Sequence, residues 1–237
     1  MRSIVIILML FIGTPYVHGQ KQFTRENMEW LQYYQVLKLN DRFLLKTDGG
    51  YRWRNTFQNN SQYIIRTGLG YRFGDRNSLS AGFAHLGFFK EDTLRTFEYR
   101  PYQEFGMNDI YIKLKIQHRF RIEERFFQTI STGSTSFNFR FRYRLFMSYS
   151  LFRWEKQELM LNLGDEIFLN AGKDIVYNVF DQNRLFAGMA FKFNKDIAVS
   201  LTYTKEVGAS NAPNSYKNNN IFWLGIKHRI DLKKKPE

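Results

Sequence analysis

Apolar and polar side chains alternate along most of this chain. Between residues 137 and 145 every odd position is aromatic or aliphatic, whereas the even positions are Asn138, Arg140, Arg142 and Arg144. Successive side chains of an extended strand point to opposite faces, so this run has one apolar and one charged face. The same period recurs elsewhere, and no stretch after residue 20 keeps a helical period. The chain is therefore predicted to be all-β.

The alternation predicts eleven strands separated by turn-forming or polar segments. Their expected ranges are 29–38, 42–54, 61–73, 78–89, 97–106, 110–127, 136–151, 157–169, 183–193, 197–206 and 219–231. Short turns, among them Asn40-Asp41 and Met107-Asn108-Asp109, alternate with longer connections. The longer connections are expected at 55–60, 90–96, 128–135, 170–182 and 207–218. Short periplasmic turns and longer extracellular loops are typical of an outer-membrane barrel, here an antiparallel one.

An odd number of strands cannot close a wholly antiparallel barrel, so ten or twelve strands are expected. Strands from 42–54 to 219–231 would close as ten. Segment 29–38 then needs a preceding strand from residues 20–28, which would make twelve, or a place inside the lumen. Residues 20–28 are a short polar segment, a composition that argues against a lipid-facing strand. The barrel itself is expected to span 29–231.

The apolar face could be the exterior of a membrane barrel or the core of a soluble one. Three features favour the membrane. The expected strands are longer than the five or six residues common in soluble sheets. Aromatic residues gather at strand ends, for example Tyr51, Trp53 and Trp154, as the interfacial girdles of membrane barrels require. The third feature is an export signal at the N-terminus.

Residues 1–19 have the order of a secretory signal peptide. Arg2 precedes an apolar run from Ile4 to Ile12, and the segment ends at the small residue Gly19. That run is too short to cross a bilayer as a helix, and cleavage is expected near Gly19. Export places the mature chain outside the cytoplasm.

Composition narrows the function classes. The 237 residues include no Cys, which excludes a disulfide scaffold, a thiol nucleophile and a zinc-thiolate site. Charged residues make up 24% of the chain and the mean hydropathy is −0.45, so a bundle of membrane helices is excluded. The formal charge of +13, to which a basic tail at 232–237 contributes, indicates anionic partners. Because the chain is exported, nucleic acid is not expected to be one.

If the apolar face contacts the membrane, the charged face lines the lumen, where basic side chains outnumber acidic ones. A charge network is expected from Arg52, Arg66, Arg100, Glu104, Arg119, Arg121, Glu123, Arg125, Arg140, Arg142, Arg144, Glu166 and Arg184. Cross-strand ion pairs would stabilise and fill a lumen of this size. Alternatively, the excess of basic side chains in the lumen would give a narrow pore that prefers anions.

The sequence contains few residues that could form a catalytic site. The mature chain has three histidines, His85, His118 and His228, and alternation places all of them on the apolar face, where a lipid-processing enzyme would have its site. Ser80, five residues from His85, falls on the opposite face. No metal-binding or phosphate-binding motif is present, so neither a catalytic residue, a metal nor a cofactor is predicted. A membrane-embedded lipid enzyme and a barrel that binds partners through its loops stay as alternatives.

Four segments resemble a known family. They are 100–105 (RPYQEF), 118–126 (HRFRIEERF), 165–170 (DEIFLN) and 180–184 (FDQNR), and their order and spacing are similar to the bacterial outer-membrane family named domain of unknown function 2490. The resemblance runs from about Trp30 to Ile230. It implies a β-barrel in the outer membrane of a Gram-negative cell and lends no catalytic residue. The expected partners are therefore outer-membrane lipids and lipopolysaccharide, the barrel-insertion machinery and small anionic solutes.

Overall fold

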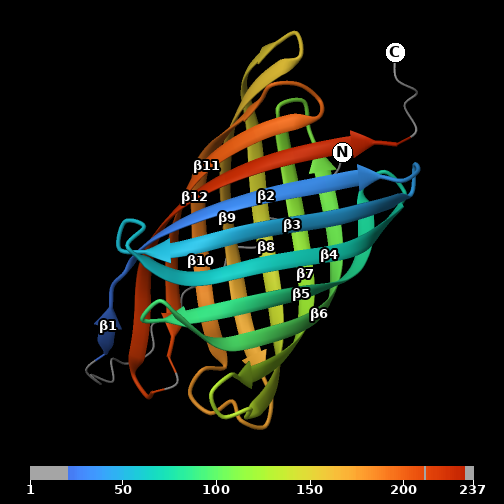
Figure 1. Ribbon diagram of the computed structural model, residues 1–237. Helices are drawn as coiled ribbons and strands as arrows, with labels where there is room; N and C mark the ends of the chain where they lie inside the picture. Colours follow the sequence, from blue (N-terminus) through green and yellow to red (C-terminus); the bar gives the residue numbers. More distant parts are fainter. Residues whose placement is uncertain (1–20, 211, 233–237) are drawn as a thin grey trace, which may run out of the picture.

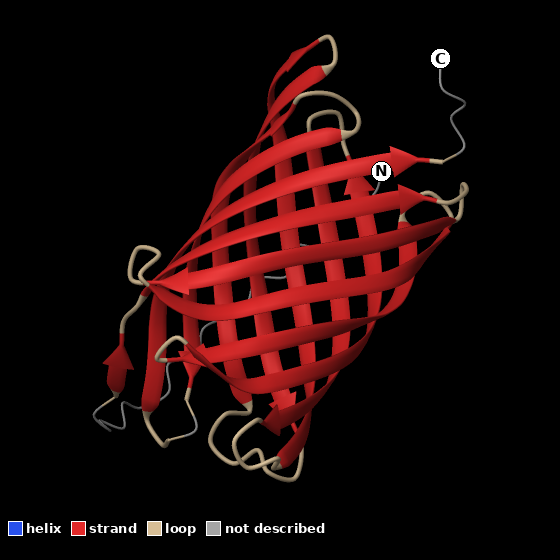
Figure 2. Ribbon diagram, in the orientation of Figure 1, coloured by secondary structure: helices blue, strands red, loops and turns tan. Residues whose placement is uncertain are grey.

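The computed structural model describes residues 21–210 and 212–232, which form one twelve-stranded sheet without helices (Figures 1 and 2). No helix in this described part could therefore cross a membrane. The predicted signal peptide lies outside the described residues. The strands are β1 (Gln22–Thr24), β2 (Asn27–Lys38), β3 (Phe43–Arg54), β4 (Asn59–Phe73), β5 (Asn77–Lys90), β6 (Thr93–Ile110), β7 (Leu114–Thr129), β8 (Thr135–Trp154), β9 (Gln157–Ala171), β10 (Phe180–Lys192), β11 (Ile197–Ala209) and β12 (Ser215–Asp231).

The sheet closes into a barrel, and the closure differs from the one expected. Each strand from β2 to β12 pairs antiparallel with its neighbour in sequence, and β12 pairs with β2 in parallel from Asn220↔Asn27 to Asp231↔Lys38. The prediction of an all-β, antiparallel transmembrane barrel is confirmed, but its wall has eleven strands instead of ten or twelve. Segment 29–38 is a full wall strand and does not lie in the lumen. The parity argument failed because it assumed that every pair, including the last, is antiparallel.

The short strand β1 extends the same seam. Gln22 pairs with Ser215, and β2 resumes the parallel pairing at Asn27↔Asn220 with an unchanged offset along β12. β1 and β2 therefore form one interrupted strand along one edge of β12, and Figure 1 shows β1 beyond the end of β2. Residues 22–24 and 27–28 of the polar N-terminal segment thus contribute paired backbone at the mouth of the barrel.

The turns at the two ends are more alike than the sequence indicated. The connection expected at 90–96 is a two-residue turn of Glu91 and Asp92, both with positive φ, a geometry that suits tight hairpins. The Asn60 N–H donates to Asp92 Oδ1 at 2.6 Å, and this bond holds the pKa of Asp92 below its ordinary value. The one connection at that end longer than five residues is 172–179. We call this the loop end and the opposite one the turn end.

The turn expected at Met107-Asn108-Asp109 is wrong. β6 continues through these residues to Ile110, and the chain reverses at 111–113. The Gln117 side chain donates to Asn108 Oδ1 at 2.7 Å across the β6–β7 pair. A side-chain partner across the ladder allows a turn-forming residue to stay in the strand.

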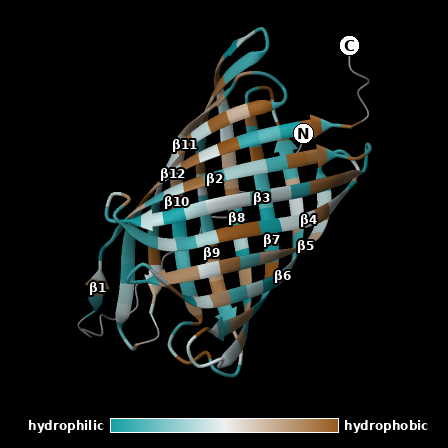
Figure 3. Ribbon diagram, in the orientation of Figure 1, coloured by the Kyte–Doolittle hydropathy of each residue, from teal (hydrophilic) through white to brown (hydrophobic). Residues whose placement is uncertain are grey.

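The outer surface of the barrel is apolar. Hydrophobic and hydrophilic positions alternate along several of the long strands (Figure 3). The outward members stay exposed although they are large, as at Ile65, Leu69, Phe120 and Phe141. An exposed apolar surface of this extent marks a membrane-facing wall in a closed barrel. The arginines and carboxylates on the alternate positions of these strands are therefore directed into the lumen.

Candidate functional site

The structure brings the thirteen residues of the predicted charge network together in the lumen. Arg121 and Arg142 are among those that are almost fully buried, and Glu123 is completely inaccessible. The inward positions come from β3 to β10, and the alternation that was read from sequence sets their direction. Most of the guanidinium groups lie in ion pairs, as a buried charge requires.

Glu123 on β7 is the most heavily used carboxylate. Its Oε2 accepts from Arg140 at 2.6 Å, and its Oε1 accepts from Arg142 at 2.5 Å. Arg100 and Arg121 approach the same group at 3.7 and 3.6 Å. Three strands meet at this carboxylate: β7 supplies Glu123 and Arg121, whereas β6 and β8 supply the other three arginines.

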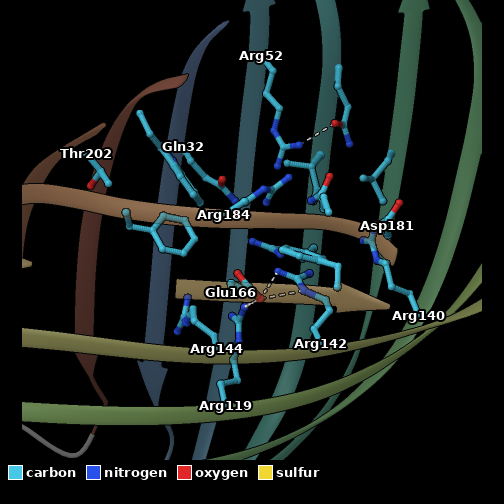
Figure 4. Close-up of a pocket in the computed structure, with 18 of the residues that line it drawn as sticks. Gln32, Arg52, Arg119, Arg140, Arg142, Arg144, Glu166, Asp181, Arg184 and Thr202 are labelled. Atoms are coloured by element: carbon cyan, nitrogen blue, oxygen red, sulfur yellow. Dashed lines mark hydrogen bonds and ion pairs between the residues drawn. The ribbon is translucent and has the colours of Figure 1, made fainter. Parts of the chain in front are cut away.

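Five further carboxylates pair with arginines of the lumen. Glu166 accepts from Arg119 at 2.5 Å and from Arg142 at 2.7 Å, as the dashed lines in Figure 4 show. Glu98 binds Arg100 at 2.6 Å and Arg125 at 2.8 Å. Glu104 binds Arg121 at 2.5 Å. Asp48 and Glu206 pair in the same way with Arg66 and Arg184. Each carboxylate ties neighbouring strands of the wall together.

Stacked side chains cross the lumen, a feature that alternation cannot predict. The guanidinium of Arg52 lies 3.9 Å from the ring centre of Trp30, and that of Arg184 lies 4.9 Å from the same ring. Arg184 also lies 4.8 Å from the Phe168 ring, which Arg142 approaches at 4.3 Å. Contacts of this kind each contribute about 0.5–2 kcal/mol. We call Arg52, Trp30, Arg184, Phe168 and Arg142 the lumen crossbar, because it connects β3 with β8.

A cavity of about 380 Å³ adjoins the crossbar inside the lumen (Figure 4). That volume falls in the range of small-molecule sites. Four of its cationic lining residues have no carboxylate within ion-pairing distance among the described residues: Arg52, Arg144, Lys217 and Lys227. Arg52 donates to the neutral Gln62 at 2.7 Å, and the buried Nε of Arg144 has no hydrogen-bond partner in the described chain. The cavity therefore carries uncompensated positive charge.

The three histidines all face outward, and each hydrogen-bonds a tyrosine hydroxyl on the adjacent strand. The pairs are His85–Tyr63 at 3.0 Å, His118–Tyr143 at 2.9 Å and His228–Tyr33 at 2.8 Å. Ser80 lies on the lumen side instead, where it accepts from Lys46 at 3.0 Å. Within the described ranges no group of His, Asp and Glu residues has the arrangement of a metal site.

Some lumen residues were missing from the predicted set. Asp181 at the start of β10 accepts from Arg140 at 3.0 Å. Trp30, Ile64, Leu86 and Phe168 are buried inside although they are apolar. Phe168 has the same parity as Glu166, so alternation did carry the signal for its direction. Because Phe168 is apolar, it was not expected inside a charged lumen.

The comparisons with known proteins agree with this fold. The profile of the family "Protein of unknown function (DUF2490)" matches residues 28–217. A solved structure titled "NanC porin structure in rhombohedral crystal form" superposes with a TM-score of 0.50 at 12% sequence identity, covering 82% of this chain and 90% of the porin chain. No curated protein matches this sequence. The chain is thus porin-like in fold, and it belongs to the DUF2490 family.

Proposed function

We propose that this protein is a non-enzymatic barrel of the outer membrane that admits small anions into a cationic lumen. The proposal rests on three of the four cavity cations without carboxylate partners, Arg52, Arg144 and Lys227. If every cation of the lumen had a carboxylate partner, no further negative charge would be needed there. Cations that line a cavity without such a partner are stabilised when an anion enters. Rings of Arg and Lys favour anions in pores, and the porin-like fold supports a transport role.

The crossbar makes the pathway narrow. Guanidinium and aromatic groups fill the lumen between β3 and β8, so an entering anion meets charged side chains directly and keeps little of its hydration. Small anionic solutes are the substrates that this geometry favours. The paired arginines hold the wall, and the unpaired cations bind the solute.

Location and orientation can be tested by labelling, since the chain has no cysteine of its own. With the loop end outside the cell, an Asp174→Cys variant in the 172–179 connection should react with an impermeant maleimide on intact cells. A Lys195→Cys variant at the turn end should react only after the outer membrane is permeabilised. Labelling of the second variant alone on intact cells would reverse the orientation, and recovery of the protein in the soluble periplasm would reject the membrane location.

Anion entry into the cavity can be tested by anomalous scattering. Crystals soaked in bromide should show an anomalous peak beside Arg144 and Lys227, and the peak should disappear in an Arg144→Gln, Lys227→Gln variant. The matched control is Lys156→Gln, which removes a cation from the exposed 155–156 turn and should leave the peak unchanged. A cavity without bromide in the wild-type protein would argue against the proposal.

A further inference from the structure

The outer wall carries a groove of about 680 Å³ at the parallel seam between β12 and β2, close to the loop end. Its walls come from β11, β12, β2 and β3 and from the 55–58 turn. The exposed apolar residues that line it include Leu31, Phe57, Leu201, Phe222 and Leu224. A concave apolar surface within a lipid-facing wall can hold an acyl chain along its length.

Register arranges the groove in rows. Leu224 pairs with Leu201 on β11 and with Leu31 on β2, which makes an apolar row. One step nearer the mouth, Phe222 pairs with Tyr203 and with Glu29. Glu29 is only 8% exposed, and its Oε2 accepts from the Phe57 N–H at 3.1 Å. Its charge is thus directed to the backbone of the turn that forms one wall.

The next row is polar and ends the groove. Asn220 lies opposite Lys205 on β11 and Asn27 on β2. The Lys205 ammonium donates to Asn220 Oδ1 at 2.8 Å, and the Asn220 amide donates to Asn27 Oδ1 at 3.0 Å. No carboxylate of the described chain lies within ion-pairing distance of Lys205. A cation with donors to spare therefore stands at one end of an apolar groove.

We propose that this groove is a binding site for one membrane lipid with an anionic head group. An acyl chain lies along Leu201, Phe222 and Leu224, and the phosphate lies at Lys205 in the polar row. The chemistry of the groove agrees with such an amphiphile, because apolar rows line it and one cation without a carboxylate partner lies at its end. The site is on the outside of the wall and is independent of the lumen cavity.

Tryptophan fluorescence provides the test, because Trp53 lines the groove whereas Trp154 is exposed on the outer surface at the turn end. The protein is reconstituted in phosphatidylcholine vesicles that contain equal fractions of brominated phosphatidylglycerol or brominated phosphatidylcholine. Subtracting the signals of Trp53→Phe and Trp154→Phe variants isolates the quenching of each ring. Brominated phosphatidylglycerol should be enriched about fivefold over brominated phosphatidylcholine at Trp53, as one Lys near the surface predicts, and clearly less at Trp154.

Charge variants separate a site from ordinary boundary lipid. Lys205→Gln should abolish the enrichment at Trp53, Lys205→Arg should retain it, and Lys156→Gln should not affect it. Heat-modifiable migration on gels verifies that each variant is folded. Equal quenching of Trp53 by both lipids would overturn the proposal, since the groove would then hold boundary lipid only. Absence of quenching by either lipid would also overturn it, because protein would then cover the groove.

Discussion

A Glu123→Gln variant should lose about 3–5 kcal/mol of the free energy of unfolding, the effect expected when one partner of a buried charge cluster is removed. Glu123 is completely inaccessible and accepts from Arg140 and Arg142 at 2.6 and 2.5 Å. An amide keeps an acceptor oxygen but removes the negative charge. The guanidinium groups around it would then repel one another in a site that water reaches poorly.

The measurement is urea-induced unfolding from lipid vesicles, followed by tryptophan fluorescence. Glu155→Gln is the control, because it removes a carboxylate from the exposed 155–156 turn and should change the stability by less than about 0.5 kcal/mol. Arg144→Gln is informative as well, since this arginine has no carboxylate partner in the described chain and its loss should not destabilise the barrel. Equal stability of the Glu123→Gln and Glu155→Gln variants would show that the ion-pair network does not hold the wall.

A Trp30→Ala variant should raise the single-channel conductance several-fold. The Trp30 ring contacts the guanidinium groups of both Arg52 and Arg184, and it packs edge-on against Trp223 at 5.0 Å. Alanine removes the ring that holds these groups across the lumen. The two arginines are then free to fold back against the wall, and the narrowest part of the pathway widens.

The same variant should cost about 3–5 kcal/mol of stability, because a large buried ring is lost from the cluster with Met28 and Ile221. Conductance is therefore compared only for protein that shows heat-modifiable migration. Trp154→Ala, which removes an exposed aromatic ring from the outer surface, is the matched control and should leave conductance unchanged. An unaltered conductance in folded Trp30→Ala protein would mean that the crossbar does not limit the pathway.

Strand positions were predictable because lipid on one side and a polar lumen on the other impose alternation at every step. The prediction for β8 needed only the contrast between Phe139 or Phe141 and the arginines between them. Closure was not predictable in this way. The parallel pairing of β12 with β2 depends on where the first strand begins and on the direction in which it crosses the wall. The two-residue alternation of side chains reveals neither.

The candidate site was likewise predictable in direction but not in pairing. Alternation indicates that Arg140, Arg142 and Arg144 share the lumen face, yet it treats them as equivalent. In the structure the first two bind Glu123, whereas Arg144 has no carboxylate partner among the described residues. The crossbar arises between strands that are not neighbours, as in the contact of Arg184 with Trp30. Contacts across a lumen depend on barrel size and tilt, which one sequence does not specify.

The reversal potential of the purified protein in a planar bilayer with a potassium chloride gradient tests the central claim most directly. A lumen with unpaired Arg52, Arg144 and Lys227 predicts a potential with the sign of chloride permeation. Replacing these three residues by Gln should move the potential toward zero, whereas Lys156→Gln should not. A potential with the sign of potassium permeation in the wild-type protein, or a folded protein that carries no current, would contradict the account.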